Sequence, residues 1–291
     1  MLAGLLFGAA VTSAEPEGRV GVLVVAHGGT NRWNSAVRKA VKQADLKAPT
    51  EVALGMGMHP EEVRQLQQTV DRLERKGVSR IVVVPLFVSS HSEVFRQYEY
   101  LFRVRPKPEW AEAGGPLTLQ VPVNLGQPLD DDPSVADVLT ERAKALSRIP
   151  DRETVVLVAH GPNEDADNQQ WIQGMERLAE QIKQRGTFRA VVVHTMRDDA
   201  PKLVRNQAEQ ALRKVVAEAG RDGRVLVIPV LIAQGGVEQK IPKMLAGLSY
   251  AYHGETLLPH RKLVEWIARQ ATELSIRVPT DRSTAPSPVV E

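Results

Sequence analysis

The chain has 291 residues, of which 43% are hydrophobic and 25% charged, enough to bury the cores of two medium-sized domains. A formal net charge of +2 and an aromatic content of 4% exclude the basic field and base-stacking platforms typical of nucleic-acid binding. Because the chain contains no cysteine, disulfides, thiolate metal sites, iron–sulfur clusters and cysteine nucleophiles are excluded as well.

The N-terminus is apolar. Residues 1–14 carry no charged side chain and end in small residues before Glu15, as the core and cleavage site of a secretory signal do. They are too short to span a bilayer, and no other segment reaches that length. We therefore expect a signal peptide at 1–14 and a periplasmic or secreted protein without a membrane span. The alternative is a cytoplasmic protein with a disordered N-terminus.

Strands and helices are expected to alternate through both halves of the chain. Strict alternation with short loops predicts parallel sheets that are covered by helices on both faces. In the first half, strands are expected at 19–25, 51–54, 80–88 and 117–121, and helices at 33–44, 60–75, 92–102 and 133–147. In the second half, strands are expected at 154–159, 188–194, 224–232 and 250–252, and helices at 168–184, 201–219, 237–248 and 260–273.

The two halves repeat one another. The run Val-Leu-Val-Val-Ala-His-Gly at 22–28 returns as Val-Val-Leu-Val-Ala-His-Gly at 155–161, and three weaker proline-centred matches follow in the same order. We therefore predict an α/β protein of two duplicated lobes, each with a parallel four-stranded sheet, and a cleft between them. The N-terminal lobe is expected at 19–149, the C-terminal lobe at 151–276 and a disordered tail at 277–291. A monomer is the simplest assembly, because two lobes in one chain build the cleft without a partner.

Three histidines stand where strands end. His27 and His160 each follow a buried strand and precede a glycine, and His91 lies just beyond the third strand. The first and third strands of such sheets are often neighbours, so His27 and His91 could converge at the edge where ligands bind. Two imidazoles suit a borderline divalent metal such as Fe, Co, Ni or Zn. The alternative is that each histidine only caps a helix or bonds a loop carbonyl.

Two further residues have open roles. The second-half segment equivalent to the His91 loop, residues 233–238, contains no histidine, so His160 either reaches across the cleft or is a structural relic. Glu93 could relay protons, or it could simply be a first-turn carboxylate that the helix dipole favours.

Several of the sequence segments described above resemble those of a known enzyme family. The Ala-His-Gly turn after the first strand, the Val-Val-Val-Pro-Leu-Phe strand with His91 beyond it, and the later segments 235–242 and 257–260 resemble the class II tetrapyrrole chelatases. The most similar pattern is that of the sirohydrochlorin cobaltochelatase/ferrochelatase (CbiX-like) family in its two-lobe form. The resemblance covers nearly all of residues 19–276.

The resemblance implies insertion of a divalent metal, Co²⁺ or Fe²⁺ with Ni²⁺ as a further candidate, into a sirohydrochlorin-type tetrapyrrole without a nucleotide. His27 and His91 are the implied metal site, and with Glu93 they are the expected catalytic residues. The carboxylates of such a macrocycle require cations, so Arg32, Arg96 and Lys240, together with His160, are the expected substrate-binding residues. The alternatives are an exported metal or tetrapyrrole carrier without turnover, and a degenerate chelatase fold used only for interaction.

Overall fold

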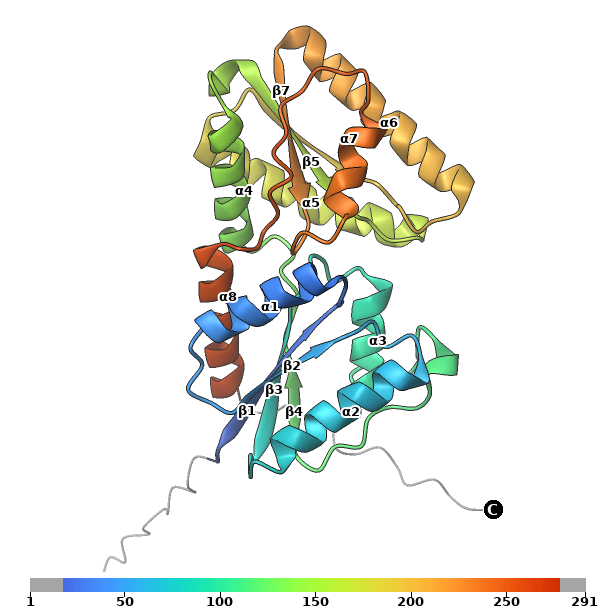
Figure 1. The fold of residues 1–291 in the computed structure, drawn as a ribbon, viewed down its shortest axis with the longest axis vertical. Coiled ribbons are helices and arrows are strands. Elements are labelled where there is room, and N and C mark those ends of the chain that lie inside the picture. Colours follow the sequence, from blue (N-terminus) through green and yellow to red (C-terminus); the bar gives the residue numbers. More distant parts are fainter. Residues whose placement is uncertain (1–17, 278–291) are drawn as a thin grey trace, which may run out of the picture.

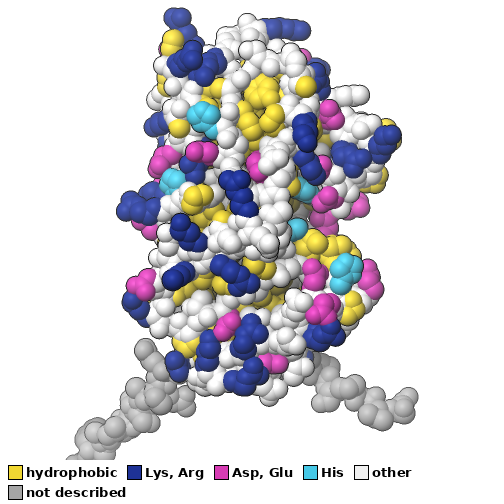
Figure 2. Space-filling view, in the orientation of Figure 1, with side chains coloured by type: hydrophobic (Ala, Val, Ile, Leu, Met, Phe, Trp, Pro, Cys, Tyr) yellow, Lys and Arg dark blue, Asp and Glu magenta, His cyan; other side chains and the backbone are white. Residues whose placement is uncertain are grey.

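The computed structural model describes residues 18–277 and shows two lobes stacked along the long axis of the molecule (Figure 1). The expected signal peptide at 1–14 and all but the first residue of the expected tail lie outside the described residues. Among residues 18–277, no helix combines the length and the apolar character that a membrane span requires. On the face drawn in Figure 2, basic and acidic side chains are interspersed, so no field of a single sign covers it.

The first lobe is built on a parallel sheet with the strand order β2-β1-β3-β4. The central strand β1 is buried along nearly all its length, because it has a neighbour on each side and helices on both faces. The strands are β1 (Val20–Ala26), β2 (Thr50–Leu54), β3 (Arg80–Pro85) and β4 (Val123–Leu125), and the helices between them are α1 (Asn31–Gln43), α2 (Pro60–Glu74), α3 (Glu93–Leu101) and the short η1 (Ala111–Ala113).

The second lobe repeats this order in reduced form, with a parallel sheet β6-β5-β7. Its strands are β5 (Glu153–Ala159), β6 (Ala190–Thr195) and β7 (Arg224–Val230), and its helices are η2 (Pro150–Arg152), α5 (Asp165–Gly186), α6 (Lys202–Asp222), η3 (Val237–Gln239) and α7 (Lys240–Met244). The structure confirms the α/β fold with two parallel sheets.

The prediction of four strands in each sheet is wrong for the second lobe. The expected strand at 250–252 contributes only an isolated bridge between Ala251 and Leu226, because one residue reaches the edge of β7 before the chain turns away. In the first lobe the expected strand at 117–121 is displaced to β4. Its Thr118 N–H bonds Gln67 Oε1 at 2.8 Å instead, so this segment follows α2 and enters the sheet later.

The last helix of each half packs on the other lobe. Helix α4 (Pro133–Leu146) lies against α5 and β7 of the second lobe, and α8 (Arg261–Ile276) lies against β3 and α1 of the first (Figure 1). Asn124 Nδ2 donates to the Leu274 carbonyl at 3.1 Å, and Arg224 Nη1 donates to the Leu146 carbonyl at 2.5 Å. The sequence halves at 19–149 and 151–276 are therefore the repeating units, whereas each packed lobe contains one helix from the other half.

One hydrophobic core consequently runs through both lobes. It joins Val24 and Val84 of the first sheet to Leu157 and Ile228 of the second through the buried faces of α1, α4, α5 and α8. The opposite faces of the two sheets have separate cores, under α2 and α3 in one lobe and under α6 and α7 in the other. Burial of this shared apolar surface fixes the two lobes relative to one another.

Candidate functional site

The carboxyl ends of β1 and β3 lie side by side, as the sequence predicted. Val25 is opposite Pro85 in the parallel register, and the Leu86 N–H donates to the Val25 carbonyl at 2.8 Å. His27 follows β1 directly, and His91 lies on the loop after β3. Both predicted metal-site histidines therefore leave the same edge of the sheet from neighbouring strands.

His27 and His160 have the same local conformation. The Nδ1 atom of His27 is 2.8 Å from the Gly28 carbonyl, and that of His160 is 2.9 Å from the Gly161 carbonyl. A carbonyl only accepts, so Nδ1 is the donor in both rings and Nε2 is the nitrogen that points away from the turn. Gly28 and Gly161 have φ of +78° and +77°, a conformation that favours glycine. The duplication has thus preserved the geometry of both turns.

The His91 loop is held by polar side chains. The backbone N–H and the hydroxyl of Ser90 donate to Asp130 Oδ1 at 2.8 and 3.1 Å, and the His91 N–H donates to Ser89 Oγ at 3.1 Å. The half-buried His91 ring makes no hydrogen bond to any residue in the described range 18–277, so both of its nitrogens can serve a cation or a proton.

Two of the predicted residues after His91 reach the second lobe. Glu93 Oε1 accepts the Asn163 N–H at 2.9 Å, which ties the start of α3 to the loop after β5. Arg96 contacts Glu109 through Nη2 at 2.6 Å and Asp167 through Nη1 at 2.8 Å. The Glu109 hydrogen bond, with further attraction from both carboxylates, raises the pKa of Arg96 above its usual range. Arg96 is thus already paired with two carboxylates and links the lobes, and its binding of substrate stays a prediction.

The other two predicted cations also have protein partners. Arg32 donates to Gln234 Oε1 across the two lobes, and Lys240 forms an ion pair with Asp198. Beside Arg32, Trp33 lies against Gly235, where an added Cβ would approach its ring to 3.1 Å. The loop after β7 therefore rests on the start of α1, and Arg32 lies where the two lobes meet, whereas the Lys240 ion pair lies within the second lobe.

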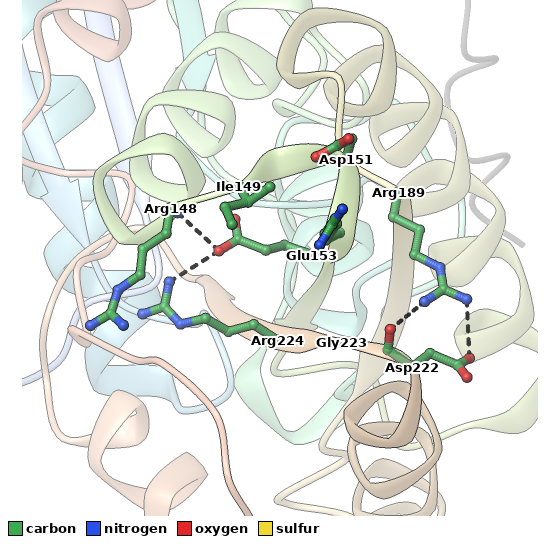
Figure 3. A pocket seen from close by; sticks show the side chains of 9 residues that line it. Arg148, Ile149, Asp151, Glu153, Arg189, Asp222, Gly223 and Arg224 are labelled. Atoms are coloured by element: carbon green, nitrogen blue, oxygen red, sulfur yellow. Dashed lines mark hydrogen bonds and ion pairs between the residues drawn. The ribbon is translucent and has the colours of Figure 1, made fainter.

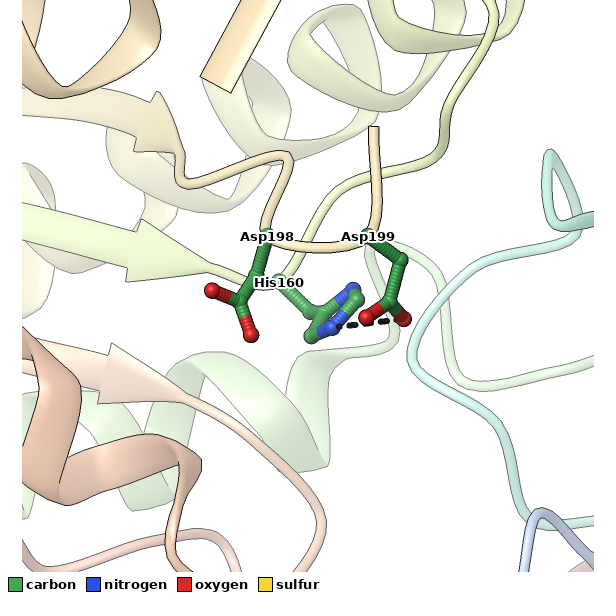
Figure 4. Close-up of side chains that lie close together, drawn as sticks. All are labelled: His160, Asp198 and Asp199. Carbon is green, nitrogen blue, oxygen red and sulfur yellow. Dashed lines mark ion pairs between the residues drawn. The ribbon is translucent and has the colours of Figure 1, made fainter. Parts of the chain in front are cut away.

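Two carboxylates that sequence reasoning missed converge on His160. Asp198 and Asp199 follow β6, which pairs with β5 so that Thr195 is opposite Ala159. Asp199 Oδ2 is 3.4 Å from His160 Nε2, and one ligand atom from each of the three residues lies within 4.8 Å of the others (Figure 4). Within residues 18–277, no other three His, Asp or Glu residues are grouped in this way. The available signal was an acidic pair shortly after the second strand of this half, at the sheet edge where His160 also lies.

His194 has a structural role. Its Nε2 donates to the Ala208 carbonyl at 2.7 Å, which joins β6 to α6. Burial lowers the pKa of its imidazole below the ordinary value of 6.5, against a smaller opposing effect of the Ala208 hydrogen bond.

This burial predicts a pH dependence of stability. The unfolded state binds the His194 proton at higher pH than the folded state, so the free energy of unfolding should fall as the pH drops through 6.5. Urea denaturation at about pH 7.5 and about pH 5.5 should show this loss. A His194→Gln variant keeps an amide donor and should show a smaller loss. Equal losses in variant and wild type would contradict the assignment.

A cavity lies at the opposite edge of the second sheet. It has a volume of about 450 Å³ and is lined by Arg148, Arg189, Glu153 and Arg224, among others (Figure 3). Burial alone would raise the pKa of Glu153, but hydrogen bonds from Ser147, the Arg148 N–H and Arg224 lower it. These arginines therefore enclose a satisfied carboxylate at the amino ends of the strands, away from the histidines.

Known proteins share this architecture. The solved structure of SirB from Bacillus subtilis with Fe³⁺ superposes with a TM-score of 0.62 and 15% identity, covering 89% of this chain and 96% of SirB. A CbiX structure, described as the terminal enzyme for siroheme biosynthesis in denitrifying bacteria, gives a TM-score of 0.56 at 14% identity, covering 87% of this chain and 98% of its own. At these identities the likeness shows the fold.

Sequence comparison adds the family. A sirohydrochlorin cobaltochelatase of Methanococcoides burtonii is 22% identical over 128 residues, which are 43% of this chain and 95% of the relative. A sequence profile of the CbiX family matches residues 21–146 and again residues 154–274, one match for each half of the chain. This double match confirms the resemblance seen in the sequence and shows that the chain belongs to the CbiX family.

Proposed function

We propose that this protein is a metal chelatase that inserts Co²⁺ or Fe²⁺ into a sirohydrochlorin-type tetrapyrrole without a nucleotide. The observation that carries the proposal is the double family match on a fold that sets His27 and His91 at the ends of neighbouring strands. The relative named as a sirohydrochlorin cobaltochelatase and the SirB structure with Fe³⁺ support this chemistry and both candidate metals.

The proposed reaction exchanges two pyrrole N–H protons for the metal. It requires a group that holds a partly dehydrated cation and a group that accepts protons near neutral pH. A neutral imidazole can do either. The Nδ1–H of His27 is bound to the Gly28 carbonyl, so its Nε2 lone pair is available to bind the metal or take a proton. His91 offers the second imidazole, and Glu93 is the carboxylate through which protons would leave.

The ring carboxylates would be bound at the border between the lobes. Arg32 and Lys240 each have a single described partner, Gln234 and Asp198 respectively, and a substrate carboxylate could replace it. An arginine fork suits a carboxylate because two parallel N–H groups match its two oxygens. Arg96 is the weaker candidate, since two carboxylates already hold it.

The test is a metal-insertion assay with purified protein. Sirohydrochlorin would be mixed with Co²⁺, Fe²⁺ or Ni²⁺, and the change in ring absorbance followed with the protein at substoichiometric concentration. Product that exceeds the amount of protein supports the chelatase. A change that stops at one equivalent supports the rival, a carrier of metal or tetrapyrrole without turnover.

We propose in addition that the protein is exported and acts as a monomer in the periplasm or outside the cell. The apolar segment at 1–14 supports export, and two lobes in one chain support the monomer. Mass spectrometry of protein from the periplasmic fraction should find residues 1–14 removed, and size-exclusion chromatography should give a single-chain mass. An intact N-terminus on cytoplasmic protein would favour the cytoplasmic alternative.

A further inference from the structure

We propose that His160, Asp198 and Asp199 form a second divalent-cation site, separate from His27 and His91. The three residues come from the carboxyl ends of β5 and β6, which are adjacent parallel strands. One ligand atom from each lies within 4.8 Å of the other two, so a single cation can contact all three after small side-chain rotations (Figure 4). The site belongs to the second lobe, which has no counterpart of His91.

The orientation of the His160 ring indicates that the space between the three side chains suits a positively charged ligand. Its Nδ1 donates to the Gly161 carbonyl at 2.9 Å, which leaves Nε2 as the ring nitrogen that faces the two aspartates. Nε2 lies 3.4 Å from Asp199 Oδ2, so the space between the ring and the carboxylate suits a positively charged ligand. A cation between them satisfies both. The neutral imidazole with its second nitrogen bonded to a backbone carbonyl is the usual state of a metal-binding histidine.

The loops that carry these ligands are held in place by Arg197. This residue is only 8% exposed, and its guanidinium donates to the Pro162 carbonyl at 3.2 Å, to the Asn163 carbonyl and to Asp165 Oδ1 at 2.5 Å. Its backbone N–H donates to the His160 carbonyl at 2.7 Å. The two loops are thus joined without a metal, so a cation would enter a site whose backbone is already set.

The ligand set defines the class of cation. Two carboxylates balance the charge of a divalent ion, and one imidazole nitrogen favours Co, Fe, Ni or Zn over Mg or Ca, which prefer oxygen ligands alone. The Asp199 side chain is 70% exposed, so an incoming ion can keep water ligands on that side. Lys240 forms an ion pair with Asp198 and would compete with the cation for that carboxylate.

The site is tested by cobalt binding, without a tetrapyrrole. Equilibrium dialysis against Co²⁺ would use the full chain carrying His27→Ala and His91→Ala. This double variant should retain one equivalent of cobalt. Adding Asp199→Asn or His160→Ala should weaken binding more than about 100-fold, because loss of a direct ligand exceeds the 10- to 100-fold cost of losing its supporting partner.

Matched controls separate this site from general surface charge. Asp151→Asn and His253→Ala each remove an exposed side chain of the same kind elsewhere and should leave cobalt affinity unchanged. Lys240→Gln removes the competing cation and should tighten binding by up to about fivefold, the size expected of a surface ion pair.

Three results would contradict the proposed cation site. These are absence of cobalt from the double variant, equal affinities of Asp199→Asn and Asp151→Asn, and displacement of cobalt by an equal concentration of Mg²⁺. Because the test background lacks His27 and His91, its outcome is independent of whether the protein proves to be a chelatase.

Discussion

Replacing His27 by alanine is expected to lower the rate of metal insertion by about 100-fold or more, the range of a positioned acid–base group. His91→Ala should have an effect of similar size. The two imidazoles leave neighbouring strand ends, and in the proposed reaction they serve one metal. Groups that act as a unit are strongly non-additive, so the double variant should be little slower than either single variant. Steady-state absorbance assays with Co²⁺ and Fe²⁺ measure this.

The matched control for this prediction is His253→Ala, which removes an exposed histidine outside the proposed site and should retain the wild-type rate. A rate within twofold of wild type for His27→Ala would refute the assigned role. Losses that multiply in the double variant would instead indicate that the two histidines act at independent points.

Replacing Trp266 by alanine is expected to destabilise the protein by about 3–5 kcal/mol, the usual cost of truncating a buried tryptophan. Trp266 lies on α8, is 1% exposed and belongs to the core that runs through both lobes. Its loss opens a cavity where the first sheet depends on a helix from the second half. Chemical denaturation followed by circular dichroism gives the change in the free energy of unfolding.

Ile276→Ala is the control on the same helix. Its side chain is 76% exposed, so the substitution should change stability by no more than about 0.5 kcal/mol. A Trp266→Ala variant that loses less than about 1 kcal/mol would show that α8 contributes little to the shared core.

Much of the fold could be predicted because its strands are buried on both faces. The continuous apolar runs around Val24 and Leu157 are strong signals, and the repeated Ala-His-Gly turns showed that they belong to equivalent positions. The neighbouring placement of β1 and β3 followed from the usual order of such sheets, and it is what brings His27 and His91 to one edge.

The helix exchange could not be predicted in this way. The apolar stripe of α4 indicates that one face of this helix is buried, but it does not identify the sheet on which that face packs. Asp198 and Asp199 were missed for a related reason. The repeat relates His91 to the segment after the third strand of the second half, whereas the carboxylates that reach His160 follow the second strand.

The exchange of α4 and α8 between the lobes has a consequence for the stability of each half on its own. A polypeptide that ended before β5 would contain α4 but not the second sheet on which α4 packs. It would also lack α8, so one face of its own sheet would be uncovered. Such a half would be stable only when paired with another copy that returns the missing helix, as in a domain-swapped dimer. In the single chain both repeats are present, and each supplies the helix that the other lobe needs. A break in the connection at 147–152 should therefore give two fragments that regain their structure only together.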